Sequence, residues 1–181
     1  MSVGLIVLMA VLALPLFWVV GAYNRLAALR GRVRNSYAQL DRQIKRRYLL
    51  ATTLTGAAKD SMGDDAALLE AVSRTVSVSQ TISSSPSTPD SIAELAHAEA
   101  ELSNALGRLL AFAAAHDALK TNADVVRLVA DLTDSDTRIG VAGLGYNASA
   151  MLYNTGLEEA PARYLAFLFR FTKATLLPAT G

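Results

Sequence analysis

Cysteine is absent from this chain of 181 residues, and histidine occurs only twice. Without cysteine the protein has no disulfide, no thiolate metal site and no cysteine nucleophile. Also missing is any stretch in which apolar and polar residues alternate for long enough to predict a β-strand. These absences leave an all-α fold as the expected class.

Charge is missing from Val3–Ala22, a run of 20 residues that is long enough to cross a hydrocarbon core about 30 Å thick. A secretory signal peptide is the alternative, but no Lys or Arg precedes the run and Gly21–Asn24 is a poor cleavage site. We therefore expect residues 1–22 to be a retained transmembrane anchor. Trp18 and Tyr23 fall where an interfacial aromatic belt is expected.

Acidic residues are scarce just after this run. Between Arg25 and Arg47 the chain has eight Lys or Arg and one acid, Asp41, whereas from Tyr48 onward it has nine bases and fifteen acids. The positive-inside rule places the N-terminus outside and the body in the cytoplasm. The basic stretch either contacts anionic lipid or only sets the topology, and its position beside the membrane argues against nucleic acid as a partner.

Apolar residues recur every three or four positions from Leu26 to Ala58, which predicts one helix continuous with the anchor and ending near Met62–Gly63. Three further stretches show the same periodicity. The second is expected to open at Asp64–Asp65, the third at the capping box Ser91–Glu94 and the fourth at the cap Asn122, with loops at Ser83–Pro89 and His116–Thr121 and an end or kink at Pro161. Short loops between long helices predict a long antiparallel four-helix bundle over residues 23–160.

Several short motifs follow one another in a characteristic order. They are Tyr23–Arg30, Arg32–Asp41, Ile44–Arg47, Leu119–Asn122, Thr137–Ala142, Tyr146-Asn147 and Tyr153–Thr155. In this order they resemble the LemA family of bacterial membrane-anchored helical proteins. The resemblance implies a bundle of long helices in the bacterial inner membrane, plasma or intracytoplasmic, with the N-terminus outside and no known enzymatic activity. Some relatives are linked to organising or remodelling membranes.

Two groups of residues have the composition of metal sites. Glu94 and His97 form the i, i+3 pair used by di-iron bundles, but no second pair accompanies them. Three aspartates lie within a predicted helix that lacks the turn a calcium loop needs, at positions Asp131, Asp134 and Asp136. We expect both groups to be solvated helix faces, and we expect no metal and no cofactor.

Tyrosine–asparagine pairs recur on the fourth predicted helix, at Tyr146-Asn147 and Tyr153-Asn154. A spacing of seven puts both pairs on one helix face. They either form a partner-binding stripe or fill the seam between helices with their hydroxyls at its edge.

Gly140, Gly143 and Gly145 each cost about 1 kcal/mol in a helix relative to alanine. Close approach of a neighbouring helix is the expected compensation, and a hinge is the alternative. On the first hypothesis, a leucine at position 143 would overpack the contact.

The C-terminal segment, residues 161–181, begins with Pro161–Phe171, an apolar run too short to span a bilayer. Arg163 and Arg170 are seven residues apart, so on a helix they share one face. We expect this segment to lie in the membrane interface with both arginines toward phosphates. The alternative is that it folds back onto the bundle.

The sequence contains no catalytic triad, phosphate-binding loop or complete metal-ligand set, so we expect a protein that is not an enzyme. The first hypothesis is a scaffold that organises membrane or recruits partners, and the second is a signalling adaptor coupled to a membrane receptor. The expected partners are membrane lipid and a protein, with a homo-oligomer as a further option. The side chains expected to contact the membrane surface are Arg25, Arg30, Arg32, Arg34, Arg163 and Arg170.

Overall fold

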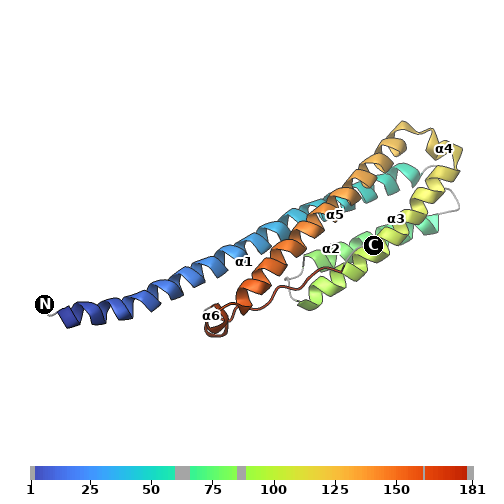
Figure 1. Cartoon of the computed structure of the whole chain (residues 1–181). Helices are drawn as coiled ribbons and strands as arrows, with labels where there is room; N and C mark the ends of the chain where they lie inside the picture. The colour runs from blue at the N-terminus through green and yellow to red at the C-terminus, as the bar shows by residue number, and fades with distance from the viewer. Residues whose placement is uncertain (1–2, 60–65, 85–88, 161, 179–181) are drawn as a thin grey trace. The chain divides into compact units, whose positions relative to one another are not determined.

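The structure is a computed structural model that describes residues 3–59, 66–84, 89–160 and 162–178, without the side chains of residues 3–16, 66 and 89–91. Within these ranges it is helical and contains no strand, which confirms the all-α class. The helices are α1 (Val3–Ala58), α2 (Ala66–Ser83), α3 (Pro89–Ala115), α4 (Asp117–Lys120), α5 (Ala123–Glu158) and α6 (Ala162–Leu168) (Figure 1).

Helix α1 is unbroken from Val3 to Ala58, as the uninterrupted apolar periodicity predicted. The predicted boundaries at Met62–Gly63 and Asp64–Asp65 lie outside the described residues, as does the side chain of Ser91. Helix α3 already begins at Pro89, because proline is well suited to the first turn of a helix.

The segment between α3 and α5 is partly helical, so the loop predicted at His116–Thr121 is wrong in its centre, where α4 forms. The predicted cap at Asn122 is confirmed. Its Oδ1 accepts hydrogen bonds from the backbone N–H of Asp124 at 3.0 Å and of Val125 at 3.3 Å. This satisfies two donors that the first turn of α5 would otherwise leave without partners.

The chain divides into two compact units, and α1 and α5 each contribute to both. The first unit contains Met1–Tyr37 and Gly145–Leu176, and the second contains Ala38–Leu144 and Leu177–Gly181. The predicted division into anchor, bundle and C-terminal segment follows different boundaries and stays a prediction.

The second unit is a helical bundle in which α2 packs against α3 and every helix from α1 to α5 contributes to one core. Successive turns of the long helices bury an apolar side chain, and each large side chain buried in this way contributes about 1.5–3 kcal/mol. The most deeply buried include Leu54, Val72, Leu102, Leu109, Leu119 and Leu132. On α5 the buried position beside Leu132 is taken by Ser135, and the next residue, Asp136, is exposed.

The first unit has a smaller core built from the start of α1, the end of α5 and the C-terminal segment. It consists of Leu26, Tyr153, Leu157 and Ala162, packed against Leu29, Val33, Ala166, Phe171 and Ala174. One side of the C-terminal segment therefore folds back onto α1 and α5, as the alternative interpretation of this segment held.

The expectation for the glycines of α5 is wrong. A Cβ built at Gly140 or Gly145 has no neighbour within 4 Å, and at Gly143 it meets only Leu177 Cδ1, at 4.0 Å. The close approach is at Gly156 instead, where a Cβ would lie 2.9 Å from Leu29 Cδ1. Gly140 and Gly145 therefore lie on sides of α5 that no other described segment covers closely, whereas Ala142 on the same turns is buried in the core.

Among the described residues, no helix has enough length and apolar character to cross a membrane. The predicted anchor falls largely on residues 1–16, whose side chains lie outside the described part.

Candidate functional site

The tyrosines of the predicted stripe bind the chain's own C-terminal segment. Tyr146 Oη donates a hydrogen bond to the carbonyl of Thr175 at 2.6 Å, and Tyr153 Oη donates one to the carbonyl of Thr172 at 3.1 Å. Burial raises the pKa of both phenols; at Tyr153 the charge of Arg30 opposes the rise. Both phenols therefore keep their protons and act as hydrogen-bond donors.

Asn154 contacts the same segment through both atoms of its amide. Its Nδ2 donates to the carbonyl of Ala174 at 2.9 Å, and its Oδ1 accepts from the backbone N–H of Ala174 at 2.8 Å. Asn147 is half-buried on the same helix. The stripe therefore binds the backbone of the chain's own C-terminal segment. A role for it in binding another protein stays a prediction.

The four arginines at the start of the predicted basic stretch differ in their surroundings. Arg25 pairs with Glu159 at 2.6 Å, and both side chains are largely in solvent. The guanidinium of Arg30 lies 5.6 Å from the ring centroid of Phe171, within the range of a cation–π contact. Arg32 and Arg34 are exposed and form no ion pair with a described residue.

Arg47, the last arginine of the basic stretch, is a core residue of the second unit. Arg47 is 5% exposed; its Nη1 donates to Asp136 at 3.0 Å and to Ser103 at 3.1 Å, and its Nη2 donates to Glu99. Tyr48 Oη also donates to Glu99. The only sequence signal for this burial is that position 47 adjoins the apolar stripe.

The pKa of Tyr48 is raised strongly. Burial is the largest cause, and the hydrogen bond to Glu99 and the charge of that carboxylate add to it, against the opposing charge of Arg47. Such a phenol keeps its proton and acts as a structural donor rather than as an acid or base.

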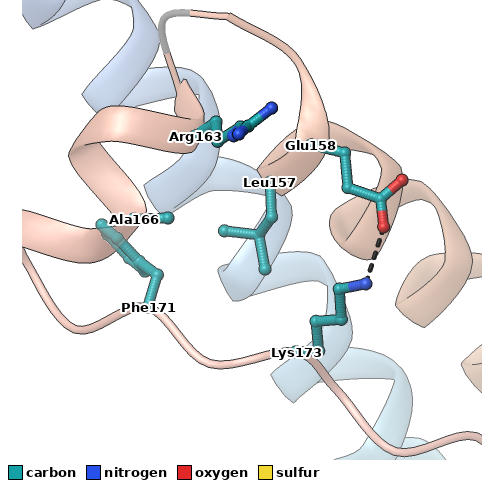
Figure 2. Close-up of a pocket in the computed structure, with 6 residues that line it drawn as sticks. All are labelled: Leu157, Glu158, Arg163, Ala166, Phe171 and Lys173. Atoms are coloured by element: carbon teal, nitrogen blue, oxygen red, sulfur yellow. Dashed lines mark hydrogen bonds and ion pairs between the residues drawn. The ribbon is translucent and has the colours of Figure 1, made fainter.

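A hollow of ≈ 530 Å³ lies in the first unit where α5, α6 and the C-terminal segment meet (Figure 2). Its apolar lining comes from Leu157, Ala166 and Phe171. Glu158 and Lys173 form an ion pair of 2.6 Å across one side, which lowers the pKa of Glu158.

Arg163 also lines this hollow, and in Figure 2 its side chain lies away from that ion pair. The lining residues include no nucleophile and no acid free of an ion pair. Their chemistry suits an anionic group with an apolar neighbour better than a reacting substrate.

Arg163 and Arg170 do not share a helix face, contrary to expectation. Helix α6 ends at Leu168, and Arg170 has a φ of 52° in the left-handed region. The backbone N–H of Phe171 donates to the carbonyl of Ala166 at 3.0 Å, a pattern with which helices commonly end at a left-handed residue. The turn at Arg170 ends the helix before the two side chains can align.

The residues of the two candidate metal groups lie on exposed or half-buried helix faces, and Asp136 also pairs with the buried Arg47. His97 and Glu101 are an exposed i, i+4 pair with 3.8 Å between Nδ1 and Oε1, and Asp134 pairs with Arg138 at 2.7 Å. Within the described ranges, no three His, Asp or Glu side chains gather closely enough to hold a metal ion.

Comparison with known proteins gives one finding about family. No curated protein sequence matches the chain. The family model described as the LemA family matches residues 36–181, which covers α5, α6, the tyrosine–asparagine stripe and all of the described part of the second unit. The chain therefore belongs to the LemA family.

Proposed function

We propose that this protein is a non-enzymatic, single-pass protein of the bacterial inner membrane that acts as a scaffold, organising membrane or recruiting partners. Its anchor, residues 1–22, would continue into a long antiparallel four-helix bundle in the cytoplasm, with the N-terminus outside. The observation that carries the proposal is the unbroken course of α1 from the uncharged run into the core of the second unit.

A continuous helix is a rigid link between membrane and body. From Ala22 to Ala58, at about 1.5 Å per residue, α1 would extend about 50 Å from the bilayer without a flexible linker. A scaffold requires such a connection between its membrane anchor and the part that meets partners. The partners proposed are membrane lipid and a protein, with self-association as an option and with neither nucleic acid nor a cofactor.

The basic stretch supports contact with an anionic leaflet over part of its length. Along the axis of α1, Arg25 and Arg34 lie about 5 and 18 Å beyond Ala22, whereas Arg46 lies about 35 Å beyond it. Charges are screened over about 8 Å at physiological ionic strength. The attraction therefore weakens from Arg25 through Arg30 and Arg32 to Arg34 and is negligible at Arg46, so lipid contact is proposed for the first four arginines only.

The second candidate function is a signalling or regulatory adaptor coupled to a membrane receptor. It is favoured by Val141 and Leu144, one helical turn apart on α5, which expose 67% and 73% of their surface. Exposed apolar side chains on a rigid helix are suited to docking a protein. Remodelling of vesicles by the purified full chain favours the scaffold, whereas a partner crosslinked at position 144 without any effect on vesicles favours the adaptor.

Topology is tested with reporters fused after Gly181 in a bacterial host, combined with alkaline carbonate extraction of membranes. We expect a reporter that works only in the cytoplasm to be active and the chain to resist extraction. Activity of a periplasm-dependent reporter would overturn the orientation, and release of the chain by carbonate would overturn the anchor.

A further inference from the structure

Helix α6 and the residue that follows it turn a cluster of large apolar side chains outward. Tyr164, Phe167, Leu168 and Phe169 are 72%, 91%, 71% and 51% exposed, and we call these four residues the aromatic patch. The opposite side of α6 is buried through Ala162 and Leu165. Folding back onto the chain therefore buries only one side of this segment.

The aromatic patch lies beside the last residues of the expected anchor and the first residue that follows it. The rings of Tyr23 and Phe169 are 5.1 Å apart between centroids. Phe17 and Trp18 of α1, themselves 76% and 60% exposed, line a hollow of ≈ 340 Å³ together with Ala162. Within the first unit, α6 is thus level with the last turns of the uncharged run, at the depth where that run would leave the bilayer.

Basic side chains accompany the patch. Arg163 is exposed on α6, Arg170 is exposed directly after Phe169, and Arg25 lies on the adjoining turn of α1. Exposed aromatic and apolar side chains flanked by arginine are the composition of segments that lie in the headgroup region of an anionic leaflet.

We propose that the aromatic patch is a second, non-spanning contact with the same bilayer. Phe167, Leu168 and Phe169 would enter the boundary between headgroups and acyl chains of the cytoplasmic leaflet, with Arg163 and Arg170 at the phosphates. This proposal rests on the proposed anchor, because the anchor brings α6 to that depth.

The consequence is mechanical. A single helix that crosses a bilayer can rotate about its own axis, and a second contact beside it prevents that rotation. The patch therefore sets which side of α5 and the C-terminal segment faces the lipid, and which side remains open to other proteins.

The test uses depth-dependent quenching in the full chain. Trp18 is the only tryptophan, so Trp18→Phe provides a silent background in which Phe167→Trp reports on the patch. The matched control is Leu144→Trp, since Leu144 is comparably exposed but lies on the second unit. Each variant is reconstituted into vesicles containing phosphatidylglycerol and lipids brominated at defined depths along their acyl chains.

We expect the tryptophan at position 167 to emit at shorter wavelength and to lose most of its emission to the shallowest brominated lipids. The tryptophan at position 144 should respond only to acrylamide in the water. Equal behaviour of the two variants overturns the proposal. It is also overturned if emission at 167 shifts with protein concentration and not with brominated lipid, which would indicate a second copy of the chain. Release of the chain from vesicles by carbonate would instead mean that the anchor itself has failed.

Discussion

Arg47 brings a full positive charge into the core of the second unit. Two carboxylates, those of Glu99 and Asp136, and the hydroxyl of Ser103 accept hydrogen bonds from its guanidinium. Desolvation of a charge is costly, and only close partners offset that cost. The arginine therefore specifies which helix faces meet, and its removal leaves Glu99 without its cation.

We expect Arg47→Ala to lower the free energy of unfolding by about 3–5 kcal/mol, because it breaks a buried ion pair. The neighbouring Arg46 is exposed, so Arg46→Ala is the matched control and should change stability by less than about 0.5 kcal/mol. Urea unfolding of the full chain in detergent, followed by helical circular dichroism, measures both. Equal effects of the two substitutions would show that the network contributes little.

Tyr48 makes the second unit sensitive to alkali. Its raised pKa means that the folded protein holds the phenol proton more tightly than the unfolded chain does. The stability contributed by this group is complete below pH about 10 and is lost as the pH rises further.

Tyr48→Phe should therefore lower stability at neutral pH, through loss of the bond to Glu99, and flatten the decline above pH 10. The exposed Tyr164 supplies the control, Tyr164→Phe. Thermal unfolding between pH 7 and pH 11 measures the difference. An unchanged alkaline slope in Tyr48→Phe would contradict this account.

At the scale of the element, Gly156 is the glycine of α5 at which side chains of α1 come closest. A Cβ there would lie 2.9 Å from Leu29 Cδ1 and 3.8 Å from Leu26 Cδ2. Because the methyl of Leu29 can move, Gly156→Ala should be nearly neutral. Gly156→Leu should destabilise by about 1–3 kcal/mol through overpacking.

Gly140 provides the contrast on the same helix, since nothing lies within 4 Å of its Cβ position. Gly140→Ala should stabilise by about 0.5–1 kcal/mol through helix propensity alone. Melting temperatures of the full chain in detergent rank the three variants. A stabilising Gly156→Leu would mean that the contact with Leu29 is absent.

The C-terminal segment is held on α5 largely through its backbone. Asn154 supplies both a donor and an acceptor to Ala174. With each hydrogen bond contributing about 0.5–1.5 kcal/mol, Asn154→Ala should speed amide exchange at Ala174 by about tenfold or more. Hydrogen–deuterium exchange measures this, with Asn104→Ala on an exposed part of α3 as the control. Unaltered exchange at Ala174 would mean that the segment is held by its apolar contacts alone.

At the scale of the whole molecule, charge is polarised along the chain, with seven net positive charges from Arg25 to Arg47 and six net negative charges after them. Basic residues within about 15–20 positions of a spanning helix determine its orientation. Replacing Arg30, Arg32 and Arg34 with glutamine should therefore increase the fraction of chains with the C-terminus outside. Dual reporters at the C-terminus measure that fraction. The same change at Arg108, Lys120 and Arg127 should leave it unaltered, and a comparable effect there would contradict the assignment.

Local patterns were enough to predict most helices. The unbroken α1, the cap at Asn122 and the wet faces around His97 and Asp134 follow from periodicity, hydrogen-bonding capacity and i, i+4 spacing, all of which act within a few residues. The glycine contacts and the shared face of Arg163 and Arg170 were predicted wrongly. The glycine contacts depend on where distant segments lie. The face shared by the two arginines depends on a single left-handed residue, Arg170, that ends α6.

The sequence by itself determined the helical class, the long course of α1, the membership in the LemA family and the polarity of charge, because each of these is a property of neighbours along the chain. Only the tertiary structure decided that Arg47 is buried, that Tyr146, Tyr153 and Asn154 hold the C-terminal segment, and that Gly156 is the close contact. The physical reason is that burial and hydrogen bonding between distant segments depend on the register in which helices pack. Local periodicity shows which side of a helix is apolar, but it does not show which residue that side meets.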